Sequence, residues 1–139
     1  MRVIVSMHVA SGAAAGALLG SRGRALAAGP LLHFACDACP HEDIPSLRFE
    51  IGSGVALLAV VAAVRGPLDP AVFGAVASSA PDVEHVVRLR RAGGRKLFPT
   101  HRFRGLHRRG GVRAWVQLLV AGAIVGTTIA RRRAPATEA

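Results

Sequence analysis

The stretch LLHFACDACPHEDIP, residues 31–45, concentrates side chains that can bind metal in an otherwise apolar chain. His33 and Asp37 are four residues apart, so in a helix their side chains project from one face. The position of His41 has two interpretations. If the helix continues, His41 lies on the same face as His33 and Asp37; if Pro40 ends the helix, His41 lies in a loop beside them. Imidazole nitrogens with carboxylate oxygens suit zinc, manganese or iron. The stretch therefore predicts a divalent metal site, with zinc as the first expectation.

A second cluster, PDVEH at residues 81–85, brings two acids and an imidazole together. Asp82 and His85 are its candidate metal ligands, and Glu84 between them is the candidate general base, free to act outside the ligand shell. His8 is a further candidate ligand, because ionisable groups inside apolar helices are costly and indicate function. The alternative is structural: buried histidines and acids pair with one another and hold no metal. Three other acids are interpreted as solvated or capping residues: Glu42, Glu50 and Asp69.

A long loop that is basic and without acids, residues 88–111, is predicted after the second cluster. Within it, Arg102 and Arg104 are the candidates for holding an anionic substrate, because arginine forms paired hydrogen bonds with phosphate and carboxylate groups. His101 and His107 are additional candidate metal ligands. The segment has no recognised nucleic-acid-binding motif. We therefore expect membrane lipid and an anionic small molecule or lipid as partners, and no nucleic acid.

The composition predicts a single all-α domain. The chain has 139 residues, 51% hydrophobic and only 4% aromatic, so its interior must consist of small, closely packed aliphatic side chains. Alanine and leucine favour helices, and the apolar segments are longer than usual strands. We expect about five helices, at residues 3–20, 25–39, 51–64, 70–87 and 112–130. They would form an up-and-down bundle over residues 1–130, followed by a basic tail at 131–139.

Up-and-down connections would place all six histidines at one end of the bundle. The opposite end would hold Arg22, Arg24, Arg65, Asp69 and the terminal arginines 131–133. Glycines recur at four-residue spacing in two of the predicted helices, as Gly12 and Gly16 in the first and Gly122 and Gly126 in the last. Such stripes of small residues let neighbouring helix backbones approach closely.

The hydropathy pattern predicts a multi-pass protein of the plasma membrane. A spanning helix needs roughly 20 mostly apolar residues, and residues 114–130 come near this with no charge inside. The N-terminal segment has an alternative interpretation as a secretory signal, since ALA at 25–27 resembles a cleavage site. Arg22 and Arg24 directly before that site, and His8 within the apolar segment, favour a helix of the bundle instead.

Three features together resemble one protein family: a histidine shortly after Met7, PDVEH at the end of an apolar helix, and THRFRGLH at residues 100–107. They are similar to the pattern of the bacterial and archaeal membrane-bound metal-dependent hydrolases, which are small multi-helix proteins. That pattern has an early His, a Pro-Asp-x-Asp-His segment and a His-Arg-Gly-x-Thr-His segment. Glu84 replaces its second aspartate, and the final histidine lies one residue further on. The resemblance spans residues 7–107 and implies metal-site roles for His8, Asp82, His85, His101 and His107.

Metal-assisted hydrolysis is the expected chemistry, in which the metal lowers the pKa of a bound water and a carboxylate accepts the proton. Two other classes of function stay open. A metal transporter or sensor would bind the ion without turnover, and a purely structural membrane protein would bind no metal.

Overall fold

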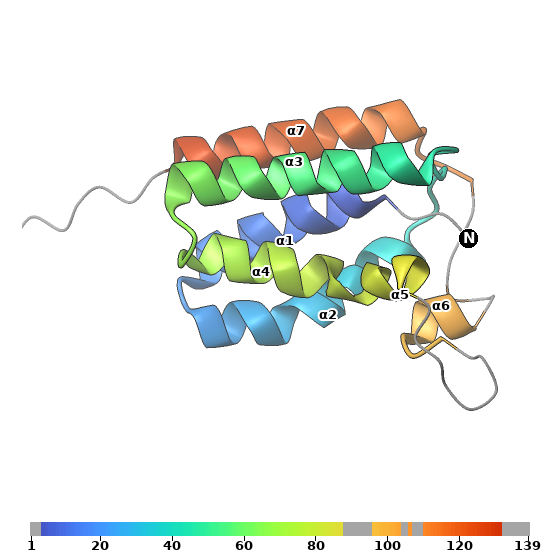
Figure 1. Ribbon diagram of the computed structural model, residues 1–139, viewed down its shortest axis with the longest axis horizontal. Coiled ribbons are helices and arrows are strands. Elements are labelled where there is room, and N and C mark those ends of the chain that lie inside the picture. Colours follow the sequence, from blue (N-terminus) through green and yellow to red (C-terminus); the bar gives the residue numbers. More distant parts are fainter. Residues whose placement is uncertain (1–3, 88–95, 104–105, 107–109, 132–139) are drawn as a thin grey trace, which may run out of the picture.

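The computed structural model describes residues 4–87, 96–103, 106 and 110–131, and within these ranges the chain is helical and contains no strand. The elements are α1 (Val5–Leu19), α2 (Arg22–Ala38), α3 (Leu47–Arg65), α4 (Pro70–Ser79), the 3-10 helix η1 (Ala80–Asp82), α5 (Val83–Val86), α6 (Pro99–Arg102) and α7 (Ala114–Ala130). The five long helices run up and down along one axis (Figure 1). The predicted all-α bundle is therefore confirmed.

Small and polar residues end the helices where the sequence predicted turns. Gly20 closes α1 in the left-handed conformation, with φ of 61°, which glycine adopts at little cost. At the start of α2, the Ser21 side chain accepts a hydrogen bond from the N–H of Arg24. Asp69 caps α4 in the same way through the N–H of Ala71. Of the two roles predicted for Asp69, solvated or capping, the structure thus shows the capping role.

The second helix ends at Ala38, before Pro40, so the interpretation of His41 as a loop residue is confirmed. Two other features of the helices differ from the prediction. The predicted helix at 70–87 divides into α4, η1 and α5, because Pro81 has no N–H with which to continue the hydrogen-bonding pattern. The basic segment is not wholly a loop either, since α6 forms within it.

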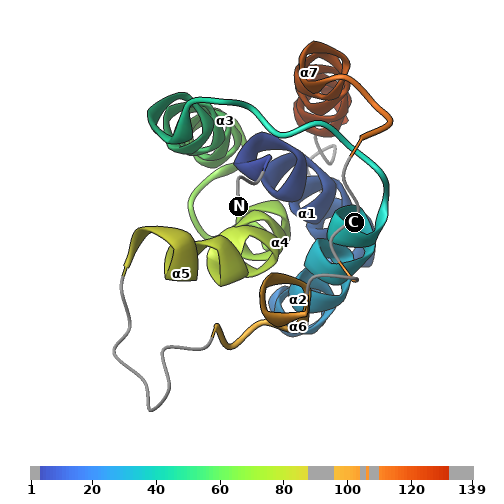
Figure 2. The same cartoon turned by 90° about the vertical axis from the view of Figure 1, so that its right-hand side faces the viewer.

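α1 lies in the middle of the bundle and contacts α2, α3, α4 and α7 (Figure 2). Its buried apolar side chains are small: Val9, Ala10 and Ala13 belong to the apolar core, together with residues of α3, α4 and α7. The backbones of α1 and α4 approach so closely that a Cβ atom on Gly12 would collide with the main chain of Gly74. The prediction of a closely packed interior of small residues is confirmed for this helix pair.

Replacing Gly12 by alanine is expected to destabilise the protein by about 1–3 kcal/mol, the usual cost of overpacking a tight contact. Gly122→Ala is the matched control, because an added Cβ there meets no atom within 4 Å and alanine favours the helix. Gly126 is equally open, so the glycines of α7 do not make the predicted close approach to any described residue. Thermal unfolding followed by circular dichroism measures both variants. Equal melting temperatures would contradict the tight α1–α4 contact.

Among the described helices, α3 is long and apolar enough to cross a membrane, with 19 residues and a mean hydropathy of 1.8. Only 17% of this span is buried inside the structure, so most of its apolar surface faces outward. α1 and α7 are apolar but shorter, with 15 and 17 residues. Residues 114–130, which α7 contains, are thus not the strongest candidate span, and helix length does not support several spans.

Candidate metal centre

Five buried side chains from four elements converge at the end of the bundle where α5 and α6 lie (Figure 1). They are His8 of α1, His33 and Asp37 of α2, Asp82 of η1 and His101 of α6. They form two overlapping groups, His8–His33–Asp37 and His33–Asp82–His101, and within each group the potential ligand atoms all lie within 4.8 Å of one another. The sequence predicted these five residues as ligands, and folding brings them together.

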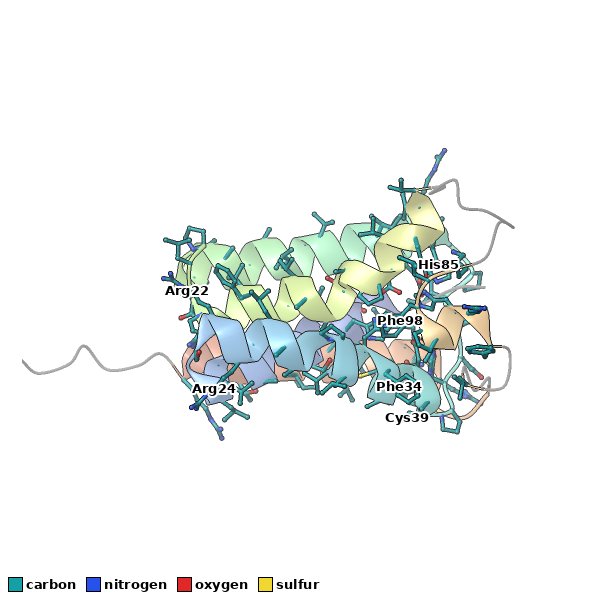
Figure 3. All side chains as sticks on the ribbon, turned by 90° about the horizontal axis from the view of Figure 1, so that it is seen from below. Arg22, Arg24, Phe34, Cys39, His85 and Phe98 are labelled. Carbon is teal, nitrogen blue, oxygen red and sulfur yellow. The ribbon has the colours of Figure 1, made fainter. Side chains whose placement is uncertain are left out.

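The other described histidines lie at the same end. His41 lines a cavity with His8, and the His85 ring is 4.2 Å from that of His101. Arg22 and Arg24 lie at the opposite end of the molecule (Figure 3). The predicted placement of the histidines at one end and of Arg22 and Arg24 at the other is therefore confirmed for these residues, while His107 lies outside the described residues.

Hydrogen bonds at Nδ1, the ring nitrogen directed away from the centre, fix the orientation of His33 and His101. His33 Nδ1–H donates to the carbonyl oxygen of Ser78 at 2.7 Å, and His101 Nδ1–H donates to Glu84 Oε1 at 2.7 Å. Carbonyl and carboxylate oxygens only accept, so each neutral ring carries its proton on Nδ1 and a lone pair on Nε2. The two Nε2 atoms are 3.1 Å apart. Lone pairs that face each other at this distance repel unless a cation or a proton lies between them.

Two carboxylates surround the same point. His33 Nε2 is 3.2 Å from Asp37 Oδ2 and 3.7 Å from Asp82 Oδ1, and His101 Nε2 is 3.5 Å and 3.6 Å from the same two atoms. His8 Nε2 lies 3.3 Å from Asp37 Oδ1, and its ring stacks on His33 with 3.9 Å between the ring centres. Three imidazoles and two carboxylates thus enclose one small volume. This donor set can hold zinc, manganese or iron.

Asp82 is the least satisfied acid of the centre. It is 5% exposed, and neither carboxylate oxygen makes a hydrogen bond to a described residue. Burial, together with repulsion from Asp37 and Glu50, raises the pKa of Asp82 to about 9. A buried carboxylate without donors is costly in its charged form. A bound cation would offset that cost.

Glu84 lies on the outer side of His101. Its carboxylate accepts hydrogen bonds from His101 Nδ1 at 2.7 Å and from the backbone N–H groups of Leu97 at 2.7 Å and Phe98 at 3.1 Å. Burial alone would raise the pKa of Glu84, but these three hydrogen bonds outweigh it and hold the pKa below its usual value. The same bonds fix the chain as it enters α6, which carries Thr100 and His101. The predicted role as a general base required a free Glu84 carboxylate, whereas this carboxylate is engaged in three hydrogen bonds.

His85 lies beside the centre but does not join either group of ligand atoms. Its Nδ1 accepts a hydrogen bond from the Lys96 ammonium at 2.9 Å, which leaves the ring proton on Nε2. Burial, with repulsion from His101 and Lys96, lowers the pKa of His85 to about 3, so the ring is neutral near pH 7. His85 thus presents an N–H donor instead of the lone pair that its predicted role as a ligand requires.

Of the two predicted substrate-binding arginines, the structure describes Arg102. Together with Lys96, His101 and Phe103 it lines an open polar cavity of about 320 Å³, and its guanidinium lies over the Phe103 ring at 5.3 Å. Two cationic side chains therefore border the space next to His101. Arg104 lies outside the described residues.

Two buried residues of this region were not predicted. The Thr100 hydroxyl donates to Asp37 Oδ2, a contact that depends on how α6 docks. Glu50 is 1% exposed, so it is not a solvated acid. Its carboxylate accepts a hydrogen bond from the Ile44 N–H at 3.3 Å at the start of α3, which agrees with its interpretation as a capping acid. It shares the buried face of α3 with Gly54 and Val61, and this helical spacing was the signal that could have revealed it.

Three of the residues that carry the resemblance to the membrane-bound metal-dependent hydrolases, His8, Asp82 and His101, lie in the centre itself. The hydrogen bonds to Nδ1 of His33 and His101, and the burial of the ligand groups, also suit a metal site. Comparisons with models of protein families, with characterised proteins and with solved structures each found no match.

Proposed function

We propose that this protein is a metal-dependent hydrolase whose metal is held by His33, His101, Asp37 and Asp82, with His8 alongside. The observation that carries the proposal is the pair of Nε2 atoms 3.1 Å apart, each with its proton held on the far side of the ring. Zinc is the first expectation for this donor set, with manganese or iron as alternatives. When bound, the metal would lower the pKa of a water ligand and so supply a nucleophile near pH 7.

The substrate we propose is anionic, either phosphate-bearing or lipid-like. The cavity that Lys96 and Arg102 share with His101 supports this, because it offers positive charge directly beside a proposed ligand. Arginine binds phosphate oxygens in pairs, and such contacts stabilise charge that develops during phosphoryl transfer. Arg104, close by in the sequence, would add to this charge.

We further propose that the bundle is embedded in the plasma membrane with several helices. Large apolar side chains are exposed on four of its long helices, namely Leu18, Leu31, Val55 and Leu119 on α1, α2, α3 and α7. Large exposed apolar surfaces are rare on soluble proteins and favour contact with lipid or a partner. If α3 crosses the bilayer, α1 and α7 lie at the same depth, because both contact α3 along the bundle. The metal centre would then lie near one membrane surface.

Elemental analysis and hydrolysis assays of the detergent-purified protein test this function. We expect bound zinc, manganese or iron, and hydrolysis of p-nitrophenyl phosphate or of phosphatidic acid in mixed micelles. A chelator should abolish turnover, and returning the metal should restore it. Metal without hydrolysis of either compound would favour transport or sensing. Absence of metal would favour the structural alternative, in which a protonated Asp82 donates to the imidazoles, an arrangement that its raised pKa favours.

Glu84→Gln is expected to weaken metal affinity by about 10- to 100-fold, the usual effect of losing a carboxylate that orients a ligating histidine. Its amide group would also face the N–H groups of Leu97 and Phe98, which need acceptors. Competition with a chromogenic chelator measures the affinity. If turnover falls while metal affinity stays unchanged, Glu84 is the general base that the sequence predicted.

A further inference from the structure

An apolar cavity of about 260 Å³ lies beside His8, with walls from α1, the end of α2, the following loop and α7. Its surface consists mostly of apolar side chains, such as Met7, Pro40 and Val120. The described residues that line it include no Asp, Glu, Lys or Arg. We call this space the His8 cavity.

The polar groups that line the His8 cavity are largely engaged within the protein. His41 Nδ1–H donates to a backbone carbonyl oxygen at 2.7 Å, and Gln117 Nε2 donates to two backbone carbonyl oxygens at 2.7 and 3.1 Å. His8 differs, because its Nδ1 is buried and makes no hydrogen bond to a described residue. The cavity thus offers contact with hydrocarbon and little that would bind a charged molecule.

His8 joins this cavity to the metal centre. Its Nε2 lies 3.3 Å from Asp37 Oδ1 inside the centre, and the same residue lines the cavity. Its ring also stacks on that of His33, with 3.9 Å between the ring centres. A molecule in the cavity would therefore touch a residue of the centre.

The cavities at His8 and at His101 differ in their chemistry. Lys96 and Arg102 border the one at His101, whereas the one at His8 is apolar. His33 contacts both histidines, and its ring centre is 5.1 Å from that of His101. Cationic groups and an apolar surface at this short separation match a molecule that has an anionic head and a hydrocarbon chain.

The His8 cavity is continuous with the exposed apolar surface of α7. Val112 and Val120 line the cavity and are 47% and 42% exposed, and Trp115 and Leu119 of α7 are exposed as well. If α7 faces lipid, a chain can enter the cavity directly from the bilayer. The volume lies just below the roughly 300–1,000 Å³ of sites that enclose a whole ligand. The cavity would therefore hold part of a long chain, and the rest would lie along α7.

We propose that the His8 cavity holds the hydrocarbon chain of the substrate, and that this substrate is a phosphate ester of a membrane lipid. The inference rests on the proposed function, since it names the substrate class of that same metal centre. In the reaction, the P–O bond to the lipid breaks, phosphorus takes the hydroxyl of a water molecule, and the lipid oxygen takes the remaining proton. Burial of the chain provides affinity that a short, water-soluble phosphate ester lacks.

Inhibition of p-nitrophenyl phosphate hydrolysis by ethyl, butyl and hexyl phosphate tests the chain site. The full-length, metal-loaded protein is kept in digitonin, a detergent with a rigid sterol group in place of an alkyl chain. We expect the affinity to rise about fourfold with each added methylene. Val120→Phe should flatten this series, because the larger side chain fills the cavity. Leu119→Phe is the matched control, since Leu119 is exposed on the same helix and does not line the cavity, and it should keep the rise.

Alkylation of Cys39 gives a measure of binding that does not depend on turnover. Cys39 is exposed and lines the cavity, and after Cys36→Ser it is the only thiol of the chain. Hexyl phosphate should slow its reaction with N-ethylmaleimide, whereas inorganic phosphate at the same concentration should not. Val120→Phe should remove this protection.

Lysophosphatidic acid in digitonin micelles tests whether the chain belongs to a membrane lipid. Val120→Phe should lower kcat/KM for its hydrolysis by about tenfold or more relative to Leu119→Phe, because part of the chain loses its apolar contacts. Equal values in the two variants would overturn a membrane lipid as the substrate.

The outcomes separate this inference from the proposed function. Equal affinity for ethyl and hexyl phosphate, with bound metal and p-nitrophenyl phosphate hydrolysis intact, would overturn the chain site and leave the proposed function standing. A chain-length series that survives Val120→Phe would also overturn the chain site. Absence of both metal and hydrolysis would overturn the proposed function and the substrate class with it. If Val120→Phe fails to fold by circular dichroism, Val120→Leu replaces it and should weaken hexyl phosphate binding, whereas unchanged binding would contradict the chain site.

Discussion

His33→Ala is expected to lower metal affinity by more than about 100-fold and to reduce hydrolysis to background. The loss should exceed the 10- to 100-fold effect of removing an orienting residue, because His33 belongs to both groups of ligand atoms. It also removes the ring on which His8 stacks and the Nε2 atom that faces His101. Competition with a chromogenic chelator measures the affinity, and elemental analysis after dialysis measures the metal that remains bound.

His41→Ala is the matched control for this variant. His41 is also a buried histidine at the same end of the bundle, but its Nδ1–H donates to the carbonyl oxygen of Cys39 at 2.7 Å. It belongs to neither group of ligand atoms. Its replacement should therefore leave the metal content unchanged. Equal loss of metal from the His33 and His41 variants would contradict the assigned ligands and point to a general loss of structure.

The metal-free protein is expected to lose stability as the pH rises from about 7 to 9. Asp82 has a pKa of about 9 in the folded protein against an ordinary value of 3.8. Between these values the folded protein holds a proton that the unfolded chain has lost, so each rise in pH favours unfolding. His85 acts in the opposite sense, but only between about 3 and 6.5, so above pH 7 the effect of Asp82 remains. Chemical denaturation in the presence of a chelator measures this slope.

Two comparisons identify the origin of this pH dependence. Asp82→Asn should flatten the profile between pH 7 and 9, because the amide does not titrate. The metal-loaded wild type should also be flatter than the metal-free protein, since the cation takes the place of the proton on Asp82. A metal-free wild type whose stability stays constant or increases over this range would contradict the protonated state of Asp82.

The sequence by itself determined the helical class, most helix boundaries and the end of the bundle at which chemistry is concentrated. These features are local or follow from simple connectivity. Gly20 and Asp69 end and cap helices through their own backbone and side-chain preferences. His33 and Asp37 share a helix face because their spacing matches the helical period. Alternating helix directions then bring the described histidines to one end.

Only the tertiary structure decided what each polar group does there. Glu84 and His85 are neighbours in the sequence, yet contacts with the chain around Lys96 and Leu97 turn one into a hydrogen-bond acceptor behind His101 and the other into a donor. Glu50 became a buried acid because α3 begins at Leu47 and turns that face inward. The tautomer of a histidine and the burial of an acid depend on partners far away in the chain. Periodicity and spacing carry no information about those partners.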